Sequence, residues 1–515
     1  MTSADLVLLN GNIITMNPKM PSAQAIAIKG DKISYVGTNQ EAKQHIDEKT
    51  QVIHLDGKTV LPGFIDTHTH VADYGRMLTW LDLEGASSVK EIQTQLSERI
   101  KHTGKDKWVL GRALNPEALS EKRLPTRQEL DTVAPDNPVI FYCQSGQACV
   151  INSKALEATK ISQQNNVGIE RNATGEPTGI LRDQATNLVW SVIPEPTEQE
   201  LCQATKLALE KIVQAGITSI HWIVLSEAEL PIIQKIVETD SLPVRVYLIV
   251  PTNLLDLALQ KLKTLENDYF KLGGAVIFAD GYLASRTAAL LEPYSDSPTE
   301  QGKLLCQQND MLTLANKIQS AGLQLIIHAV GDKAVQEALN VIQHVNCNLK
   351  IAPPRIEQAA VLSQQSVCRI KELGVSVSVQ PCVVASEFSV WSAEERLGEK
   401  RVRWLFPVKE LLSCGVLISA GSDCPMEPLN PLLGVESAVK RDGEQKVSVF
   451  EALQMYTVFA AQSASEMAEK GFIKQGKLAD LVVLQNSPVS VAVEEIATVS
   501  ACFTILGGKV FRSKS

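Results

Sequence analysis

The chain has 515 residues, of which 44% are apolar and 21% are charged, as is ordinary for a folded protein. Its 49 Lys and Arg residues against 58 Asp and Glu residues give a net charge of −9, which leaves no basic excess to bind nucleic acid or an anionic membrane surface. No apolar run reaches the roughly 20 residues of a membrane-spanning helix. We therefore expect neither nucleic acid nor a membrane as a partner, and we expect a small molecule as substrate.

The ten cysteines are scattered along the chain and form no C-x-x-C motif. In a chain of this length, that pattern indicates reduced thiols rather than a disulfide framework. The opening residues MTSADLVLLNGNIITMN do not combine a basic segment with a long apolar one, so no signal peptide is predicted. These features predict a cytoplasmic protein and leave open whether it forms a homodimer.

Short apolar segments separated by turn residues fill both ends of the chain. LVLLNGNIITM carries an Asn-Gly pair, a strong hairpin signal, and similar segments flank Gly30-Asp31 and Asp56-Gly57. KLADLVVL and VSACFTILGGKVFRS repeat the pattern near the C-terminus. We therefore expect a small β-sandwich built from residues 1–58 and 470–515.

Eight short apolar segments in the middle of the chain end in polar residues and alternate with helix-like stretches. They lie at residues 64–70, 217–223, 244–250, 275–281, 323–329, 355–359, 375–380 and 417–423. Repeated strand–helix units form a parallel sheet, and eight of them suggest an α/β fold of the closed (β/α)8 TIM-barrel type. The barrel is predicted to comprise residues 59–72 and 201–469, with its active site at the carboxyl ends of the strands.

The gap between the first and second of these strands is too long for one helix. It contains its own strand-like segments, WVLGRAL and NPVIFYCQ, and helix-like segments such as SVKEIQTQLSERI. Residues 73–200 are therefore predicted to form an inserted α+β domain that covers the barrel mouth.

Four of the eight histidines fall at the carboxyl ends of predicted barrel strands, namely His68, His70, His221 and His328. The remaining four, His45, His54, His102 and His344, lie elsewhere and are expected to be surface or structural residues. His68 and His70 form an H-x-H motif, and alternate residues of a strand point to the same side. Two imidazoles held in this way supply half of a zinc site.

Asp423 ends the eighth strand in the sequence SAGSD. An aspartate at such a position often serves only as a helix N-cap. Because it shares the barrel mouth with strand-end histidines, its carboxylate is better interpreted as a metal ligand and a base. Cys424 beside it is interpreted as a buried thiol rather than a nucleophile.

Several motifs resemble the amidohydrolase superfamily, in the branch called amidohydrolase family 3, which is similar to N-substituted formamide deformylases. They are PGFIDTHTH, LQLIIHAVGDKAV, RIEQA, SVSVQP, AGSDCPMEPLNPL, EALQMYT and GKLADLVVL, together with PTGILRDQA in the insertion and FADGYLASRTAALLEPY after the fourth strand. The resemblance covers nearly the whole chain. It implies a metal-dependent hydrolase barrel with a β-sandwich built from both ends.

This sequence departs from the two-metal pattern of that family at three positions. Val276 stands where the family has a lysine that is carboxylated to bridge two metal ions, and Lys271 lies too near the strand start to replace it. Gln358 stands where the family has the histidine of R-I-E-H, and Gln147 replaces a histidine of the insertion. Neutral amides rarely bind zinc, so the second metal site is expected to be lost.

The resemblance then implies the ligand set of single-metal members of the superfamily, His68, His70, His328 and Asp423. We expect them to hold one divalent ion, with Zn²⁺ as the expected metal. Asp423 is expected to take a proton from water and return it to a leaving nitrogen. His221 is a candidate electrophile, with a structural role as its alternative.

Five residues are predicted to bind substrate because of their positions in the motifs. They are Gln147 and Arg182 in the insertion, Asp280 and Arg286 after the fourth strand, and Gln358, which could donate a hydrogen bond in place of the missing histidine. For Asp280, a purely structural role in the turn at Gly281 is the alternative.

The sequence thus predicts a metal-dependent hydrolase acting on a non-peptide C–N bond, an amide or a formamide. The losses at Val276, Gln358 and Gln147 leave a second hypothesis, a pseudo-enzyme that binds a small molecule without converting it. A metal-assisted isomerase or lyase that uses Asp423 as a base is a third.

Overall fold

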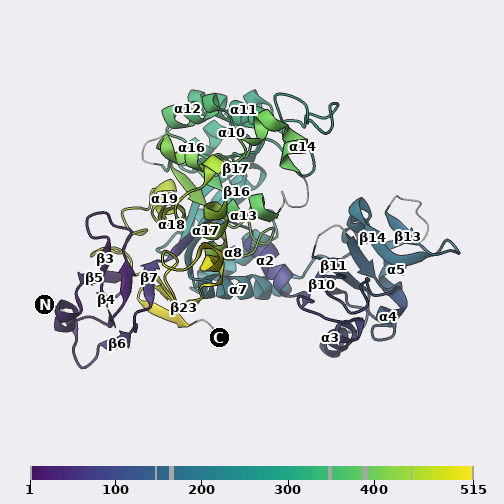
Figure 1. The fold of residues 1–515 in the computed structure, drawn as a ribbon, viewed down its shortest axis with the longest axis horizontal. Coiled ribbons are helices and arrows are strands. Elements are labelled where there is room, and N and C mark those ends of the chain that lie inside the picture. Colours follow the sequence, from purple (N-terminus) through teal and green to yellow (C-terminus); the bar gives the residue numbers. More distant parts are fainter. Residues whose placement is uncertain are drawn as a thin grey trace. The chain divides into compact units, whose positions relative to one another are not determined.

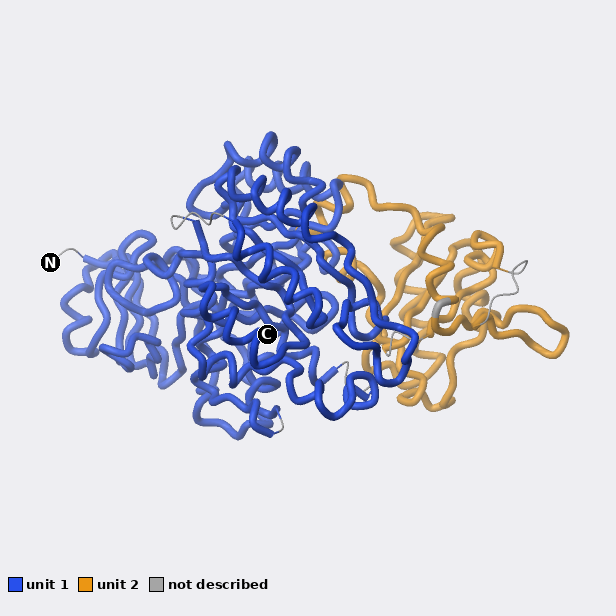
Figure 2. Tube along the Cα trace, turned by 90° about the horizontal axis from the view of Figure 1, so that it is seen from above, with its two compact units in different colours: residues 1–74, 206–515 blue, residues 75–205 orange. Residues whose placement is uncertain are grey.

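The computed structural model describes residues 3–144, 148–161, 168–345, 351–386, 392–441 and 443–512. The chain divides into two compact units, one formed by residues 1–74 and 206–515 and the other by residues 75–205 (Figure 2). Each unit is described by itself below.

The first unit contains the predicted parallel barrel sheet (Figure 1). Its strands, in spatial order, are β8 (Phe64–Thr69), β15 (Ile217–Ile223), β16 (Arg245–Pro251), β17 (Phe270–Phe278), β18 (Gln324–Ala329), β19 (Arg355–Gln358), β20 (Ser376–Val379) and β21 (Ile418–Ala420). Neighbouring strands pair in parallel, and most of their residues are buried. The predicted TIM-barrel fold is confirmed, and each predicted strand overlaps one of these.

Hydrogen bonds between the segments at the carboxyl ends of β8 and β21 bring the two ends of the barrel sheet together. The N–H of Asp423 donates to the carbonyl of His68 over 2.8 Å, and the N–H of His70 donates to the carbonyl of Cys424 over 2.8 Å. Both contacts lie at the carboxyl ends of β8 and β21. The hydrogen bonds that close the sheet therefore also place Asp423 beside the H-x-H motif.

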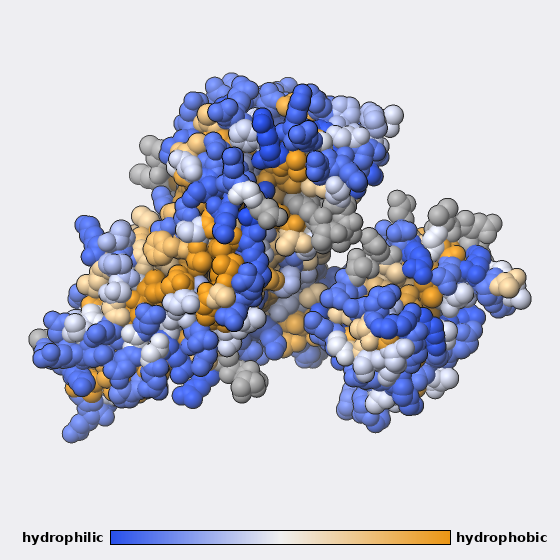
Figure 3. All heavy atoms as spheres, in the orientation of Figure 1, coloured by the Kyte–Doolittle hydropathy of each residue, from blue (hydrophilic) through white to orange (hydrophobic). Residues whose placement is uncertain are grey.

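Helices follow most of the barrel strands. They include α7 (Glu198–Gln214), α8 (Glu229–Glu238), α9 (Leu255–Leu262), α10 (Gln308–Ser320), α11 (Asp332–His344), α12 (Gln364–Glu372), α16 (Val408–Ser413), α17 (Pro431–Lys440), α18 (Val449–Met455) and α19 (Val458–Ser463). In α11, the helical spacing of Val335, Ala338, Leu339 and Ile342 puts all four on one buried side. Around α10, α11 and α12, the face drawn in Figure 3 is mainly hydrophilic.

Two sheets built from both chain ends pack on a shared apolar core. The first has the order β5-β4-β1-β6 and the second β24-β23-β22-β7-β2-β3. The strands are β1 (Leu6–Leu9), β2 (Asn12–Ile14), β3 (Ser22–Ala23), β4 (Ala25–Lys29), β5 (Lys32–Gly37), β6 (Gln51–His54), β7 (Thr59–Pro62), β22 (Leu481–Leu484), β23 (Ala501–Leu506) and β24 (Lys509–Arg512). Leu8 and Ile26 of one sheet share this core with Leu481 and Ile505 of the other.

The second unit is an α+β domain that follows the first barrel strand, as predicted. Its sheet has the order β13-β14-β12-β11-β10-β9, formed by β9 (Leu81–Asp82), β10 (Val109–Leu114), β11 (Val139–Cys143), β12 (Ala148–Ile151), β13 (Ile169–Arg171) and β14 (Pro177–Arg182). Helices α3 (Val89–Lys101), α4 (Arg127–Asp131) and α5 (Ser153–Thr159) accompany it. Over the described part of both units, no helix combines the length and apolar character needed to cross a membrane.

Candidate metal centre

His68 and His70 lie at the carboxyl end of the first barrel strand. β8 is buried along its length, His68 belongs to it, and His70 follows it directly. The two imidazole rings lie close together, with centroids 5.3 Å apart in an edge-to-face arrangement. The alternation of side chains along a strand explains why both rings share one side.

Asp423 completes a cluster of three ligand groups. Its Oδ1 atom lies 3.4 Å from Nε2 of His68 and 3.3 Å from Nε2 of His70. One ligand atom from each of the three residues lies within 4.8 Å of the others. The backbone of Asp423 has a φ of 61°, a left-handed conformation that costs a non-glycine residue of the order of 1 kcal/mol. The surrounding structure therefore holds this carboxylate in place against backbone strain.

The far nitrogen of each imidazole has a partner of its own. Nδ1 of His70 lies 3.1 Å from the carbonyl oxygen of Ile223, and Nδ1 of His68 lies 2.9 Å from Oε2 of Glu357. A carbonyl or an ionised carboxylate oxygen can only accept, so both Nδ1 atoms donate. The Nε2 atoms of His68 and His70, which face Asp423, are therefore the nitrogens that a metal ion would bind.

Buried negative charge makes this cluster attractive to a cation. Burial would lower the pKa of His68, but the carboxylates of Asp423 and Glu357 raise it to about 10. Burial would raise the pKa of Asp423, but His68 and His70 hold it well below its usual range. A divalent ion placed between these groups would supply the positive charge that the two carboxylates favour.

His328 is a further buried imidazole near the cluster, although it lies outside the group of three. It belongs to β18, in register with Glu357 on β19, and it is 2% exposed. Both ring nitrogens are buried without a hydrogen-bond partner. Burial, with the charge on His68, lowers its pKa to about 4, so the ring is neutral near pH 7. An unpartnered neutral imidazole costs folding free energy unless something binds it.

Two histidine nitrogens, one carboxylate oxygen and a nearby orphaned imidazole are the donor set that zinc prefers in hydrolytic sites. The described residues therefore fit a divalent metal ion at this end of the barrel.

Val276 stands in an apolar layer of the barrel. It is 1% exposed and belongs to a buried cluster with Ile223, Tyr247, Ile249 and Ile326. Its side chain offers no atom that can bind a metal.

Gln358 contacts the metal cluster through Asp423. Its Nε2 atom donates to Oδ2 of Asp423 over 3.2 Å, and it is 5% exposed. Its backbone φ is 70°, so Gln358 and Asp423 both adopt the left-handed conformation where they meet. Oδ1 of Asp423 thus faces the histidines, while Oδ2 is held by Gln358.

His221 lies inside the barrel and contacts Arg355. Nη1 of Arg355 lies 2.7 Å from Nδ1 of His221, and a guanidinium can only donate, so this nitrogen accepts. Burial and the charge of Arg355 lower the pKa of His221 well below its usual value. His221 is therefore a neutral acceptor for Arg355, and its role as an electrophile stays a prediction.

The two predicted substrate residues after β17 already have protein partners. The carboxylate of Asp280 accepts backbone N–H groups of Ala289, Val330 and Gly331 at 2.8, 2.9 and 2.9 Å, and it is 1% exposed. It thereby joins the loops that follow β17 and β18. Arg286 pairs with Asp296 over 2.8 Å. Contacts of either residue with substrate stay predictions.

The two predicted residues of the insertion belong to the second unit. Arg182 ends β14, lies 3.2 Å from Oε2 of Glu170, and helps to line a cavity of about 1140 Å³ formed within that unit. Gln147 lies outside the described residues. A role for either in binding substrate stays a prediction.

Sequence reasoning missed Glu357 and Arg355. Both are 0% exposed, and the Arg355 guanidinium forms an ion pair with the Glu357 carboxylate. Burial alone would raise the pKa of Glu357, but Arg355 and His68 lower it to about 2. Two opposite charges at alternate positions of a buried strand were the available signal, because charges are rarely buried unless they are paired.

The Val276 position allows a direct test of the single-metal arrangement. Val276→Lys should bind no second ion, because Gln358 would still lack an imidazole, and it should destabilise the fold by burying an ammonium group among apolar side chains. The double change Val276→Lys with Gln358→His should come closer to two ions. Metal analysis of each purified variant, with Val276→Ile as the control, measures this. Two ions in the parent protein would contradict the interpretation of Val276.

Comparison with known proteins gives matches along nearly the whole chain. The model of the amidohydrolase family matches residues 51–512. YtcJ of Bacillus subtilis is 30% identical over 98% of this chain and 99% of its own, and N-substituted formamide deformylase of Arthrobacter pascens is 26% identical over 98% and 97%. The crystal structure of an uncharacterized metal-dependent hydrolase from Pyrococcus furiosus covers 94% of this chain and 100% of its own, with a TM-score of 0.78 and 28% identity.

Proposed function

The chain belongs to the amidohydrolase family, and on that basis we propose that it hydrolyses a non-peptide C–N bond, in an amide or a formamide, at a single divalent metal ion. The observation that carries the proposal is the cluster of His68, His70 and Asp423, in which His68 and Asp423 are buried and one ligand atom from each residue lies within 4.8 Å of the others. Val276, in its apolar layer, offers nothing to bridge a second ion.

The metal ligands in this proposal are Nε2 of His68, Nε2 of His70, Oδ1 of Asp423 and the imidazole of His328. Imidazole and carboxylate donors favour Zn²⁺ among the common ions. When bound, the ion acts as a Lewis acid that polarises the scissile carbonyl and makes water more acidic.

Asp423 is the proton carrier. Its Oδ1 atom faces the two histidines, so Oδ2 is the oxygen that takes the proton of the attacking water and returns it to the leaving nitrogen. The hydrogen bond from Gln358 to Oδ2 orients that oxygen. Because Gln358 carries no charge, its hydrogen bond lowers the proton affinity of the carboxylate less than a charged donor would.

A panel of N-substituted formamides and simple N-acyl amines tests the activity. N-substituted formamides are the first choice because one relative is a deformylase of such compounds. Release of amine should require the metal, stop on chelation and return when Zn²⁺ is added back. Asp423→Asn should be inactive, whereas Asp256→Asn, whose carboxylate is an exposed partner of Lys317, should match the parent.

The rival function is a pseudo-enzyme that binds small molecules without turnover. It would be favoured if protein with one Zn²⁺ per chain released no amine from any compound while still binding some of them. Rearranged product in place of free amine would instead favour an isomerase or a lyase.

A further inference from the structure

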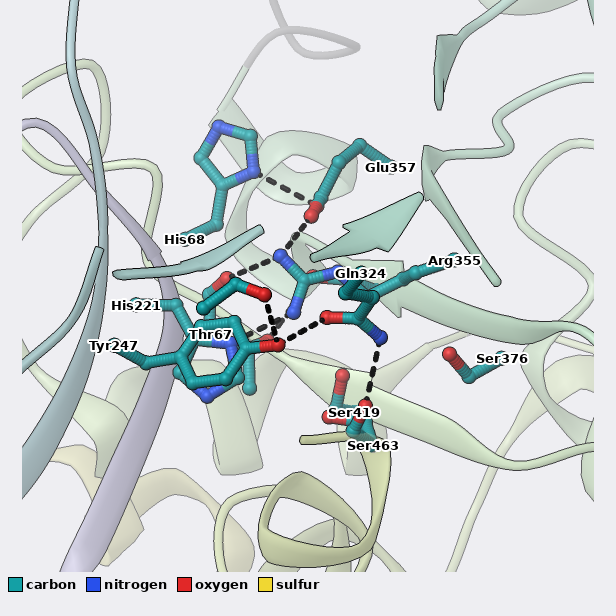
Figure 4. Close-up of polar contacts among 12 residues, drawn as sticks. Thr67, His68, His221, Tyr247, Gln324, Arg355, Glu357, Ser376, Ser419 and Ser463 are labelled. Atoms are coloured by element: carbon teal, nitrogen blue, oxygen red, sulfur yellow. Dashed lines mark hydrogen bonds and ion pairs between the residues drawn. The ribbon is translucent and has the colours of Figure 1, made fainter. Parts of the chain in front are cut away.

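A chain of buried polar side chains runs from His68 across the barrel interior (Figure 4). Glu357 of β19 begins it, with Oε2 of its carboxylate 2.9 Å from Nδ1 of His68. Glu357 is 0% exposed, so no water from outside competes for this contact. The carboxylate lies on the side of the ring opposite Asp423.

Arg355 makes it possible to bury that carboxylate. It lies two residues before Glu357 on the same strand, so both side chains project to the same side, and its Nη2 pairs with Oε1 of Glu357. A buried carboxylate without such a partner would cost several kcal/mol. The pair leaves Oε2 of Glu357 directed at His68.

Arg355 is in turn held by two other strands. Nη1 donates to Nδ1 of His221 on β15 over 2.7 Å, and Nη2 lies 3.4 Å from the carbonyl oxygen of Thr67 on β8. Two short side chains, Thr67 and Ser378, border the same space inside the barrel and hydrogen-bond to each other at 3.0 Å. The guanidinium is thus fixed between β19 and the two strands that carry His68 and His221.

We propose that Glu357, held in place by Arg355, is a positioning residue for His68: it fixes the ring with its proton on Nδ1 and directs Nε2 to the metal ion. Hydrogen-bond partners of this kind commonly set the affinity of a metal site, and their loss weakens it roughly 10- to 100-fold. The proposal names a residue for the site of the proposed function and rests on that function only for the presence of the metal.

His70 provides an internal control for this role. Its Nδ1 donates to the backbone carbonyl of Ile223, which no side-chain substitution removes. A change at Glu357 should therefore loosen His68 while His70 keeps its orientation.

Two substitutions separate the hydrogen bond from the charge. Glu357→Gln keeps an oxygen that can accept from Nδ1, whereas Glu357→Met has similar size and no good acceptor. Both substitutions leave Arg355 without its carboxylate partner. Each is therefore also combined with Arg355→Met, a double change that removes the two buried charges together and is better tolerated.

Zn²⁺ affinity, measured by competition with a chelator, is the readout, and the absorption bands of the Co²⁺-loaded protein report the ligand geometry. Whether Arg355 is kept or replaced by Met, Glu357→Met should bind Zn²⁺ at least 10-fold more weakly than Glu357→Gln. Its Co²⁺ absorption bands should also be altered. Equal affinities for Gln and Met in the folded variants would overturn the proposal.

This test needs no substrate, so it fails or succeeds apart from the proposed function. If the Gln and Met variants differ as expected but no amide is hydrolysed, Glu357 keeps its positioning role and the proposed function falls. If hydrolysis is found and both variants bind Zn²⁺ like the parent, only the positioning role falls.

Discussion

Replacing His68 by alanine should remove the metal and the hydrolytic activity together. The change leaves His70, Asp423 and His328 as ligands, and it also leaves Glu357 without the ring that it contacts. We expect kcat/KM for the best amide to fall roughly 10³-fold or more, which corresponds to about 4 kcal/mol of lost transition-state stabilisation. Metal content and amine release, measured on the same preparation, check both parts.

His102→Ala is the matched control for this experiment. His102 is an exposed residue that directly follows α3 in the second unit. It should keep the parent's metal content and rate. A His68→Ala variant that still held a full complement of metal and hydrolysed substrate at the parent's rate would exclude His68 as a ligand.

Deleting residues 475–515 should leave the chain insoluble. The deletion removes β22, which pairs with β7 on one side and β23 on the other, with Val482 opposite Leu61. It also removes Leu481 and Ile505 from the shared core, and Leu8 and Ile26 would then face water. The soluble fraction after expression and the elution volume in size-exclusion chromatography measure the effect.

A single substitution within the deleted segment tests its packing against the barrel with a smaller perturbation. Asp480 forms two hydrogen bonds with Arg245 of β16, at 2.7 and 3.1 Å, and both side chains are buried. Asp480→Ala should lower the free energy of unfolding by about 3 kcal/mol or more, because it leaves a buried guanidinium unpaired. Asp256→Ala breaks an exposed pair with Lys317 and should cost little.

For the deletion of residues 475–515, a truncated chain that stays monodisperse with the parent's melting curve would refute the shared-core account.

The sequence was most informative where a periodic pattern and the fold topology agree. Eight apolar segments predicted the barrel strands, and the rule that parallel strands end at one edge brought His68, His70 and Asp423 together. The alternation within β8 was enough to place both rings on one side.

The rest of the site depends on backbone detail that no pattern in the sequence records. Simple alternation along β19 would point Glu357 and Gln358 to opposite sides, yet Glu357 contacts His68 and Gln358 contacts Asp423. The left-handed backbone at Gln358, with a φ of 70°, ends the regular strand geometry there. Asp280 likewise bonds to backbone groups from two loops, and the fold of those loops cannot be derived from one sequence.

The most direct test of the single-metal account is anomalous scattering from crystals of the unmodified protein grown with saturating Zn²⁺, with metal analysis of the same sample. We predict one fully occupied ion per chain, bound by His68, His70, His328 and Asp423. Two fully occupied ions near each other would contradict the account of Val276 and Gln358, and no ion at this position would contradict the ligand set.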